Sequence, residues 1–150
     1  MAEAVGTEQI VKEIQIGASP ETVFGFFTEP DKLVRWLCSE ATVDPRPGGV
    51  CRQTHYADDG AGPYLMRGEY VEVVPPSRVV FTWGWEGSDM NTPPGSTTVE
   101  VTLEQDDAGT RLTLVHRDLP EPARDGHDSG WVHKLERLAV AATGGDPEAR

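Results

Sequence analysis

The chain has 150 residues, of which 13 are Lys or Arg and 25 are Asp or Glu, and its formal net charge is −12. A surface this acidic repels phosphate backbones and anionic lipid headgroups, which argues against nucleic acid and membranes as partners. The length is typical of one domain, which we expect to span residues 8–143 between flexible tails at 1–7 and 144–150.

The cellular compartment follows from what the sequence lacks. No apolar run approaches the roughly 18 residues of a membrane-spanning helix. The acidic N-terminal segment has neither the basic nor the apolar region of a signal peptide, so we expect a cytoplasmic location. Cys38 and Cys51 fit that compartment as free thiols, with a disulfide between them as the alternative. The four histidines are scattered and no Cys-x-x-Cys occurs, so we expect no metal site and no cofactor.

The first third of the chain predicts one strand and two short helices. Residues 8–16 alternate between apolar and polar side chains, which is typical of a strand. Ser19 is placed to cap a helix that begins with Pro20, and a second short helix follows residues 29–31. The apolar faces of these elements are formed by Ile10, Ile14 and Ile16, by Val23, Phe24, Phe26 and Phe27, and by Leu33, Trp36 and Leu37.

From residue 40 the apolar periodicity changes from 3.6 to 2, which indicates strands. The predicted strands are 40–44, 50–56, 64–74, 78–85, 96–104 and 110–117. Hairpin-sized connections separate several of them, and the segment 106–109 is a strong hairpin signal. Short connections favour an antiparallel meander, which has one face to bury.

The C-terminal part predicts one long helix after a polar linker at 118–126. Its apolar stripe consists of Trp131, Leu135, Leu138 and Ala142, and its opposite side is expected to carry Lys134, Glu136 and Arg137. The whole is an α+β domain, in which a curved antiparallel sheet of six to seven strands surrounds the long C-terminal helix. A curved sheet cannot close tightly along a single helix, so a gap between them is the natural place for a ligand.

Six segments in register resemble the family of activator-of-heat-shock-protein-90-ATPase homologues, over roughly residues 8–142. They are 19–24 with Trp36, 45–49, 68–76, 78–83, 109–116, and 127–131 with Leu135 and Leu138. The family belongs to the SRPBCC, or START-like, superfamily. The resemblance implies the helix-grip fold also seen in birch-pollen allergens, with a ligand cavity between sheet and helix. It leaves the function broad, because the superfamily includes carriers, receptors and cyclases.

Aromatic and polar side chains are expected to line this cavity. Phe81 and Trp83 share one face of a strand, Trp85 belongs to the same expected lining, and Trp131 faces the sheet from the helix. For each of these side chains, plain core packing is the alternative to ligand contact. The predicted ligand-binding residues are Phe81, Trp83, His116, Trp131, Tyr70, Met66, Gln53, His55 and Leu135.

Three residues are candidates for catalysis. His116 ends an inward-facing strand face and could act as a general base, or it could be hydrogen-bonded within the core near His127. His55 points inward only if it shares the inner face of its strand with Cys51 and Gln53, since a slip of one residue inverts every side chain. Glu72 is a candidate interior carboxylate beside Tyr70, and it would need a partner such as Arg67, Arg52 or His55.

These observations support three hypotheses about function. The leading one is a protein that binds a small apolar or aromatic molecule in the cavity. The second is a cavity enzyme of cyclase, dehydratase or hydrolase type that uses His116 or His55. The third is an interaction module, associated with a chaperone or forming a homodimer.

Overall fold

The computed structural model describes residues 9–57, 59–87 and 92–147. Within these residues the chain forms seven strands and three helices. In chain order the elements are β1 (Ile10–Ile16), α1 (Pro20–Thr28), α2 (Pro30–Leu33), β2 (Glu40–Val43), β3 (Val50–His55), β4 (Tyr64–Val74), β5 (Arg78–Trp83), β6 (Thr97–Asp106), β7 (Gly109–Arg117) and α3 (Glu121–Ala142).

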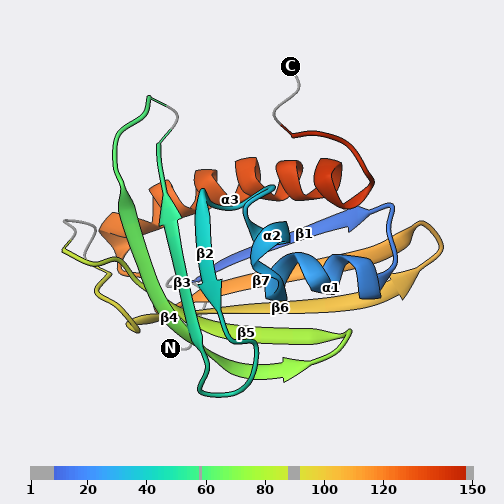
Figure 1. Cartoon of the computed structure of the whole chain (residues 1–150), viewed down its shortest axis with the longest axis horizontal. Coiled ribbons are helices and arrows are strands. Elements are labelled where there is room, and N and C mark those ends of the chain that lie inside the picture. The colour runs from blue at the N-terminus through green and yellow to red at the C-terminus, as the bar shows by residue number, and fades with distance from the viewer. Residues whose placement is uncertain (1–8, 58, 88–91, 148–150) are drawn as a thin grey trace, which may run out of the picture.

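The seven strands make one antiparallel sheet in the order β1-β7-β6-β5-β4-β3-β2. Strands β2 to β7 form a meander, and β1 pairs with β7 at the far edge. In Figure 1, β2, β3 and β4 run steeply while β1, β6 and β7 run nearly horizontally, so the sheet is strongly curved. Helix α3 lies across its inner face. The predicted α+β fold, a curved sheet around a long C-terminal helix, is confirmed.

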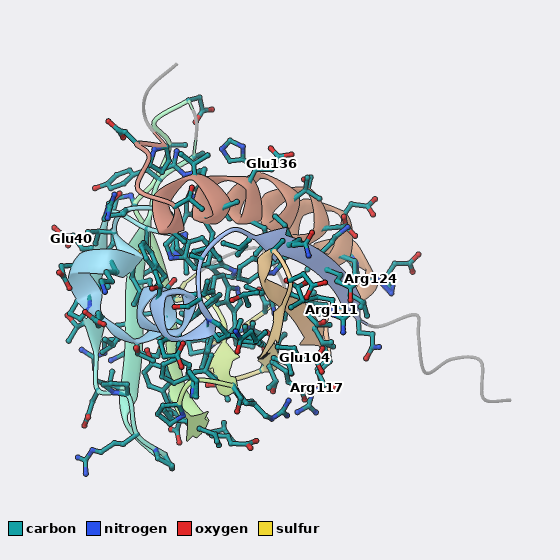
Figure 2. All side chains as sticks on the ribbon, turned by 90° about the vertical axis from the view of Figure 1, so that its right-hand side faces the viewer. Glu40, Glu104, Arg111, Arg117, Arg124 and Glu136 are labelled. Carbon is teal, nitrogen blue, oxygen red and sulfur yellow. The ribbon has the colours of Figure 1, made fainter. Side chains whose placement is uncertain are left out.

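The core lies on the inner face of the sheet. Strand β6 buries alternate residues from Thr97 to Leu103, and β7 does the same from Thr110 to His116. The outer face carries ion pairs, such as that between Arg111 and Glu104 at 3.0 Å and that between Arg117 and Glu100 at 2.6 Å. Figure 2 shows Glu104, Arg111 and Arg117 at this outer side. The clean alternation explains why the sequence predicts these strands well.

A side-chain cap begins α1, and buried hydrogen bonds join α1 to the sheet and to the segment that follows α2. Ser19 caps α1, as predicted, by accepting a bond of 3.2 Å from the backbone N–H of Thr22. The Trp36 indole N–H donates to the Phe26 carbonyl at 2.9 Å, and the Tyr70 hydroxyl of β4 donates to the Phe27 carbonyl at 2.9 Å. These bonds pair polar groups that would otherwise be costly to bury.

Helix α3 begins earlier than the sequence predicts. The expected linker 118–126 is wrong, because the helix starts at Glu121. Pro120 precedes it in an extended conformation, with φ −66° and ψ 153°. Pro122 is tolerated because the first N–H groups of a helix have no partner within it. Between Ala123 and Trp131 no residue of α3 is buried, whereas Leu135, Leu138, Ala141 and Ala142 are.

The register that the sequence left open at β3 and β4 is fixed in the structure. Cys51, Gln53 and His55 are the buried residues of β3. In β4 a bulge between Tyr70 and Glu72 shifts the pairing with β5. The interior position expected for Glu72 is therefore wrong, and its half-exposed carboxylate lies 3.0 Å from Arg78 Nε. Strand β5 ends at Trp83, two residues earlier than predicted, and Trp85 makes an isolated bridge with Met66.

Candidate functional site

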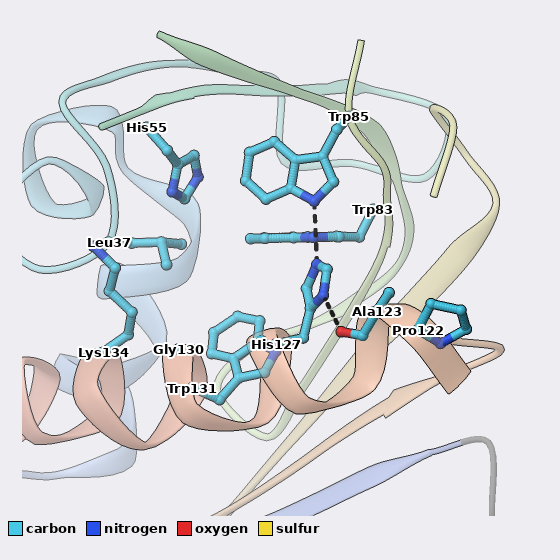
Figure 3. Close-up of a pocket in the computed structure, with 11 residues that line it drawn as sticks. Leu37, His55, Trp83, Trp85, Pro122, Ala123, His127, Gly130, Trp131 and Lys134 are labelled. Carbon is cyan, nitrogen blue, oxygen red and sulfur yellow. Dashed lines mark hydrogen bonds between the residues drawn. The ribbon is translucent and has the colours of Figure 1, made fainter. Parts of the chain in front are cut away.

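A pocket of about 390 Å³ lies where α3 leaves the sheet. The helix contributes Pro122, Ala123, Gly126, His127, Gly130, Trp131 and Lys134, and the facing side consists of Leu37, His55, Trp83 and Trp85. Figure 3 shows α3 on one side of this space, with the rings of Trp131 and His127 extending from it, and the rings of Trp83, Trp85 and His55 on the other side. The pocket therefore occupies the part of the sheet–helix interface where α3 buries no side chain between Ala123 and Trp131.

Two glycines on α3 help to create this space. Gly126 and Gly130 are one helical turn apart, and a Cβ atom built at either position meets no atom within 4 Å. Each glycine costs a helix interior about 1 kcal/mol relative to Ala. Their place in the pocket was not predicted from the sequence, although two glycines four residues apart in a helix were a usable signal.

Trp83 is the centre of the aromatic wall. Its ring centroid lies 5.5 Å from that of Trp85, nearly perpendicular at 89°, and 5.3 Å from that of Trp131. The His55 ring stands edge-on to Trp85 with the centroids 5.0 Å apart. Edge-to-face packing of this kind favours a fixed arrangement of the rings. The Trp83 indole N–H is buried and has no hydrogen-bond partner within the described part of the chain.

The backbone after β5 holds Trp85 beside the pocket. The Trp85 N–H donates to the Thr92 carbonyl at 2.7 Å, and the Glu86 N–H donates to the Leu65 carbonyl at 2.9 Å. A side chain at Gly84 would collide with the carbonyl of Pro93, so glycine permits the close approach of the two segments. Trp83 and Trp85 therefore both line the pocket, as alternate residues of one strand would, although β5 ends at Trp83.

A hydrogen bond joins the sheet side of the pocket to the helix. The Trp85 indole N–H donates to His127 Nε2 at 3.1 Å. His127 Nδ1 lies 2.8 Å from the Ala123 carbonyl, which can only accept, so Nδ1 carries the proton and the imidazole is neutral. Burial lowers the pKa of His127, which favours this neutral form. The expected proximity of His127 and His116 is present, with ring centroids 5.3 Å apart.

His116 lies beneath the aromatic wall and uses both ring nitrogens. Its Nδ1 accepts from the Trp131 indole N–H at 3.0 Å, so Nε2 carries the proton and donates to Thr97 Oγ1 at 2.8 Å. Thr97 in turn donates to the Trp83 carbonyl at 2.8 Å. Burial lowers the pKa of His116 to about 3, with His127 as a smaller cause. This neutral imidazole supports two tryptophans of the pocket and does not itself line it.

His55 does line the pocket, from β3. Its Nε2 lies 2.8 Å from Gln53 Oε1, and the Gln53 amide lies 3.8 Å from the Cys51 sulfur. His55 Nδ1 has no hydrogen-bond partner among the described residues. Burial lowers the pKa of His55 to about 3, with smaller contributions from the positive charge of Lys134 and from His127. His55 therefore presents a neutral ring to the space.

The other predicted residues lie outside the pocket lining. Met66, Tyr70, Phe81, Gln53 and Leu135 are buried in the core. The expectation that Lys134 covers the outer side of the helix is wrong, because Lys134 lines the pocket. The reason is that the pocket stripe of α3 runs through positions 126, 130 and 134, next to the core stripe through Trp131, Leu135 and Leu138.

A comparison with protein families decides the relationship of this chain. The model of the family described as Activator of Hsp90 ATPase homolog 1-like protein matches residues 17–143. The chain belongs to this family. The resemblance that the sequence indicated is thus confirmed, and so is the helix-grip fold of the SRPBCC superfamily. Family and fold together support a ligand-binding or interaction module in general.

Solved structures of proteins from other organisms resemble this one. An AHSA1-like protein from Rhizobium etli is 39% identical with a TM-score of 0.69, over 93% of this chain and 84% of that chain. A protein from Chromobacterium violaceum is 25% identical with a TM-score of 0.77, over 90% of this chain and 97% of that chain. An AHSA1-like protein from Aeromonas hydrophila, 22% identical over 95% of this chain and 96% of that chain, shares the fold with a TM-score of 0.73. A search of curated proteins finds no match.

Three further observations concern metal ligands, membrane-spanning helices and the two cysteines. In residues 9–57, 59–87 and 92–147, no group of three or more His, Cys, Asp and Glu side chains is placed to hold a metal ion. No helix in the same residues is long and apolar enough to cross a membrane. Cys38 and Cys51 are free thiols, and burial raises the pKa of each to about 12, which makes both poor nucleophiles.

Proposed function

We propose that this protein binds a small apolar or aromatic molecule in the pocket between its sheet and the first half of α3. The observation that carries the proposal is an aromatic wall, built by Trp83, Trp85 and Trp131, that faces a space left open by Gly126 and Gly130. At about 390 Å³ the pocket is at the small end of the range for ligand sites, roughly 300–1,000 Å³. That size suits a molecule of one or two rings.

The chemistry of the lining supports binding more than turnover. Both ring nitrogens of His116 are engaged, and His127 accepts from Trp85 while it donates to a backbone carbonyl. His55 has one nitrogen without a partner in the described residues, but its pKa of about 3 makes it a weak base near neutral pH. The cysteines are poor nucleophiles because burial raises the pKa of each.

The proposal is tested by filling the pocket from the helix. A leucine side chain at position 130 would enter the open space without meeting a neighbour at its Cβ. We expect Gly130→Leu to weaken binding of a neutral aromatic probe, naphthalene-2-carboxamide, at least tenfold in isothermal titration calorimetry. The same change should raise the free energy of unfolding by up to about 1 kcal/mol, because leucine is a much better helix former than glycine.

The matched control is Ser129→Leu, which adds the same side chain to the exposed side of the same helical turn. This variant should bind the probe as the wild type does. A wild type that does not bind the probe, or a Gly130→Leu variant that binds it unchanged, would contradict the proposal.

A further inference from the structure

One ring nitrogen in the pocket lining is accessible and has no hydrogen-bond partner. His55 Nε2 lies 2.8 Å from Gln53 Oε1, whereas Nδ1 has no partner among the described residues. In the same residues, the buried side-chain atoms that lack a partner are Trp83 Nε1, Thr92 Oγ1 and Arg117 Nε. His55 Nδ1 is not one of them, so this atom is accessible, and the ring that carries it lines the pocket.

A chain of hydrogen bonds behind His55 determines which of its nitrogens carries the proton. The chain ends at the Phe27 carbonyl, which only accepts, so the Tyr70 hydroxyl donates to it at 2.9 Å. The Tyr70 oxygen is then left to accept from the Cys51 thiol, which is its hydrogen-bond partner on the neighbouring strand. The Cys51 sulfur accepts from the Gln53 amide N–H at 3.8 Å, and Gln53 Oε1 accepts from His55 Nε2.

This direction gives each acceptor of the chain a donor. If the Gln53 amide turned over, its oxygen and the Tyr70 oxygen would both depend on the single proton of the Cys51 thiol. One of these buried oxygens would lose its donor, which costs free energy. The proton of His55 therefore lies on Nε2. The ring is neutral, because burial lowers the pKa of His55 to about 3, and its Nδ1 presents a lone pair to the pocket.

The other side chains of the lining do not offer such a lone pair. Trp and Lys side chains donate hydrogen bonds and do not accept them. His127 uses both ring nitrogens, since its Nε2 accepts from the Trp85 indole at 3.1 Å and its Nδ1 donates to a backbone carbonyl at 2.8 Å. Among the described residues, His55 Nδ1 is therefore the one side-chain acceptor of the lining that is accessible and unpaired.

The aromatic wall lies next to this nitrogen. The centroid of the His55 ring is 5.0 Å from that of Trp85 and 5.7 Å from that of Trp83. The two indoles stand nearly perpendicular, at 89°, so a flat ring that packs against the face of one meets the edge of the other. Figure 3 shows His55 beside both indoles. A ring held by this wall thus places a polar substituent within reach of His55.

We infer that the ligand is a small, neutral aromatic molecule with an O–H or N–H group, such as a phenol or an N–H heterocycle, and that this group donates a hydrogen bond to His55 Nδ1. The inference rests on the proposed function, because it names the class of molecule that the same pocket binds. An analogue without a donor would displace water from Nδ1 and leave this acceptor unpaired, so the pocket selects against it.

Two probes with the same oxygen atom test the inference by calorimetry. 2-Naphthol is neutral at pH 7 and carries an O–H group, and 2-methoxynaphthalene has a methyl group in place of that hydrogen. 2-Naphthol should bind the wild type about tenfold more tightly, which is the size expected of one hydrogen bond. His55→Phe keeps a ring but removes the acceptor, so it should lower this preference about tenfold.

The matched control is His133→Phe, which makes the same exchange on α3 outside the pocket lining. This variant should keep the preference of the wild type for 2-naphthol. Because the same two probes are compared in each protein, the effect of the additional methyl group cancels between the two variants.

A second measurement needs only the wild type, so it decides the matter even if His55→Phe does not fold. The ¹⁵N shifts of the histidine rings report which nitrogen carries the proton. In the free protein, His55 Nδ1 should have the shift of an unprotonated nitrogen. Addition of 2-naphthol should move this resonance upfield, because a lone pair that accepts a hydrogen bond is more shielded, and 2-methoxynaphthalene should not.

The outcomes separate this inference from the proposed function. If the two probes bind the wild type equally well, the donor class is wrong although the pocket still binds aromatic molecules. A His55→Phe variant that folds and keeps the preference, or a free protein in which His55 Nδ1 carries the proton, would also overturn the inference. So would an Nδ1 resonance that 2-naphthol leaves unmoved. If neither probe binds, the proposed function itself fails.

Discussion

Mild acid should destabilise this protein through its buried histidines. The pKa of His55 and that of His116 are each lowered to about 3 by burial, whereas a histidine in the unfolded chain titrates near 6.5. Well above pH 6.5, at about pH 8, these histidines are neutral in both states. As the pH falls below 6.5 the unfolded chain binds protons that the folded chain does not, so the free energy of unfolding decreases until the folded histidines also titrate.

The size of the effect follows from the two pKa values. Between pH 7 and pH 5, a histidine with a pKa of about 6.5 in the unfolded chain and about 3 in the folded chain costs about 2 kcal/mol of stability. The pair therefore costs about 4 kcal/mol, and His127, whose pKa is also lowered, adds to this. A loss of this size is a large part of the 5–15 kcal/mol that is typical of a domain.

Urea denaturation followed by circular dichroism at pH 8, 7, 6 and 5 measures this loss. Between pH 8 and pH 7 the histidine contribution should be nearly flat. Between pH 7 and pH 5 it should fall steeply, and His116→Gln should reduce the fall by about 2 kcal/mol, whatever it does to stability at pH 8. A total decrease below 1 kcal/mol between pH 7 and pH 5, or a His116→Gln variant with the slope of the wild type, would refute the reasoning.

Two further substitutions test the support of the pocket. Thr97→Val keeps the shape of the side chain but leaves His116 Nε2 and the Trp83 carbonyl without their partner, so it should cost about 2 kcal/mol or more in urea denaturation. A decrease in the free energy of unfolding below about 0.5 kcal/mol would mean that the hydrogen bonds of Thr97 contribute little to stability. Gly68→Ala should cost about 1–3 kcal/mol, because a Cβ there collides with the Thr82 carbonyl of the next strand. Gly126→Ala is its control, since open space surrounds that position and alanine should stabilise the helix by up to about 1 kcal/mol.

The order of the elements could be predicted from the sequence because each has a clear apolar period. Ser19 with Pro20 marks the start of α1, and the two residues between Asp106 and Gly109 mark the hairpin of β6 and β7. The start of α3 was missed because Pro120, Pro122 and Gly126 read as a linker. A proline in the first turn of a helix is nevertheless favourable, and this signal was available at Pro122.

The candidate site could be predicted only in part. Its aromatic wall follows from the alternation of Trp83 and Trp85 and from the place of Trp131 on the helix. Lys134 could not be assigned to the pocket from periodicity, because the pocket stripe through 126, 130 and 134 lies next to the core stripe of α3 and has the same helical spacing. Nor could Glu72 be excluded from the interior, since the bulge after Tyr70 depends on pairing with β5 and not on local sequence.

The placement of the tryptophans gives this protein an internal optical reporter. Three of its four indoles, Trp83, Trp85 and Trp131, surround the pocket, while Trp36 is fully buried beside Phe27 and outside the lining. Indole emission depends on polarity and on nearby rings, so a molecule that enters the pocket changes the fluorescence of three emitters and leaves the fourth as a reference. Occupancy can therefore be followed in the unlabelled protein, and a library of compounds can be screened before any ligand has been identified.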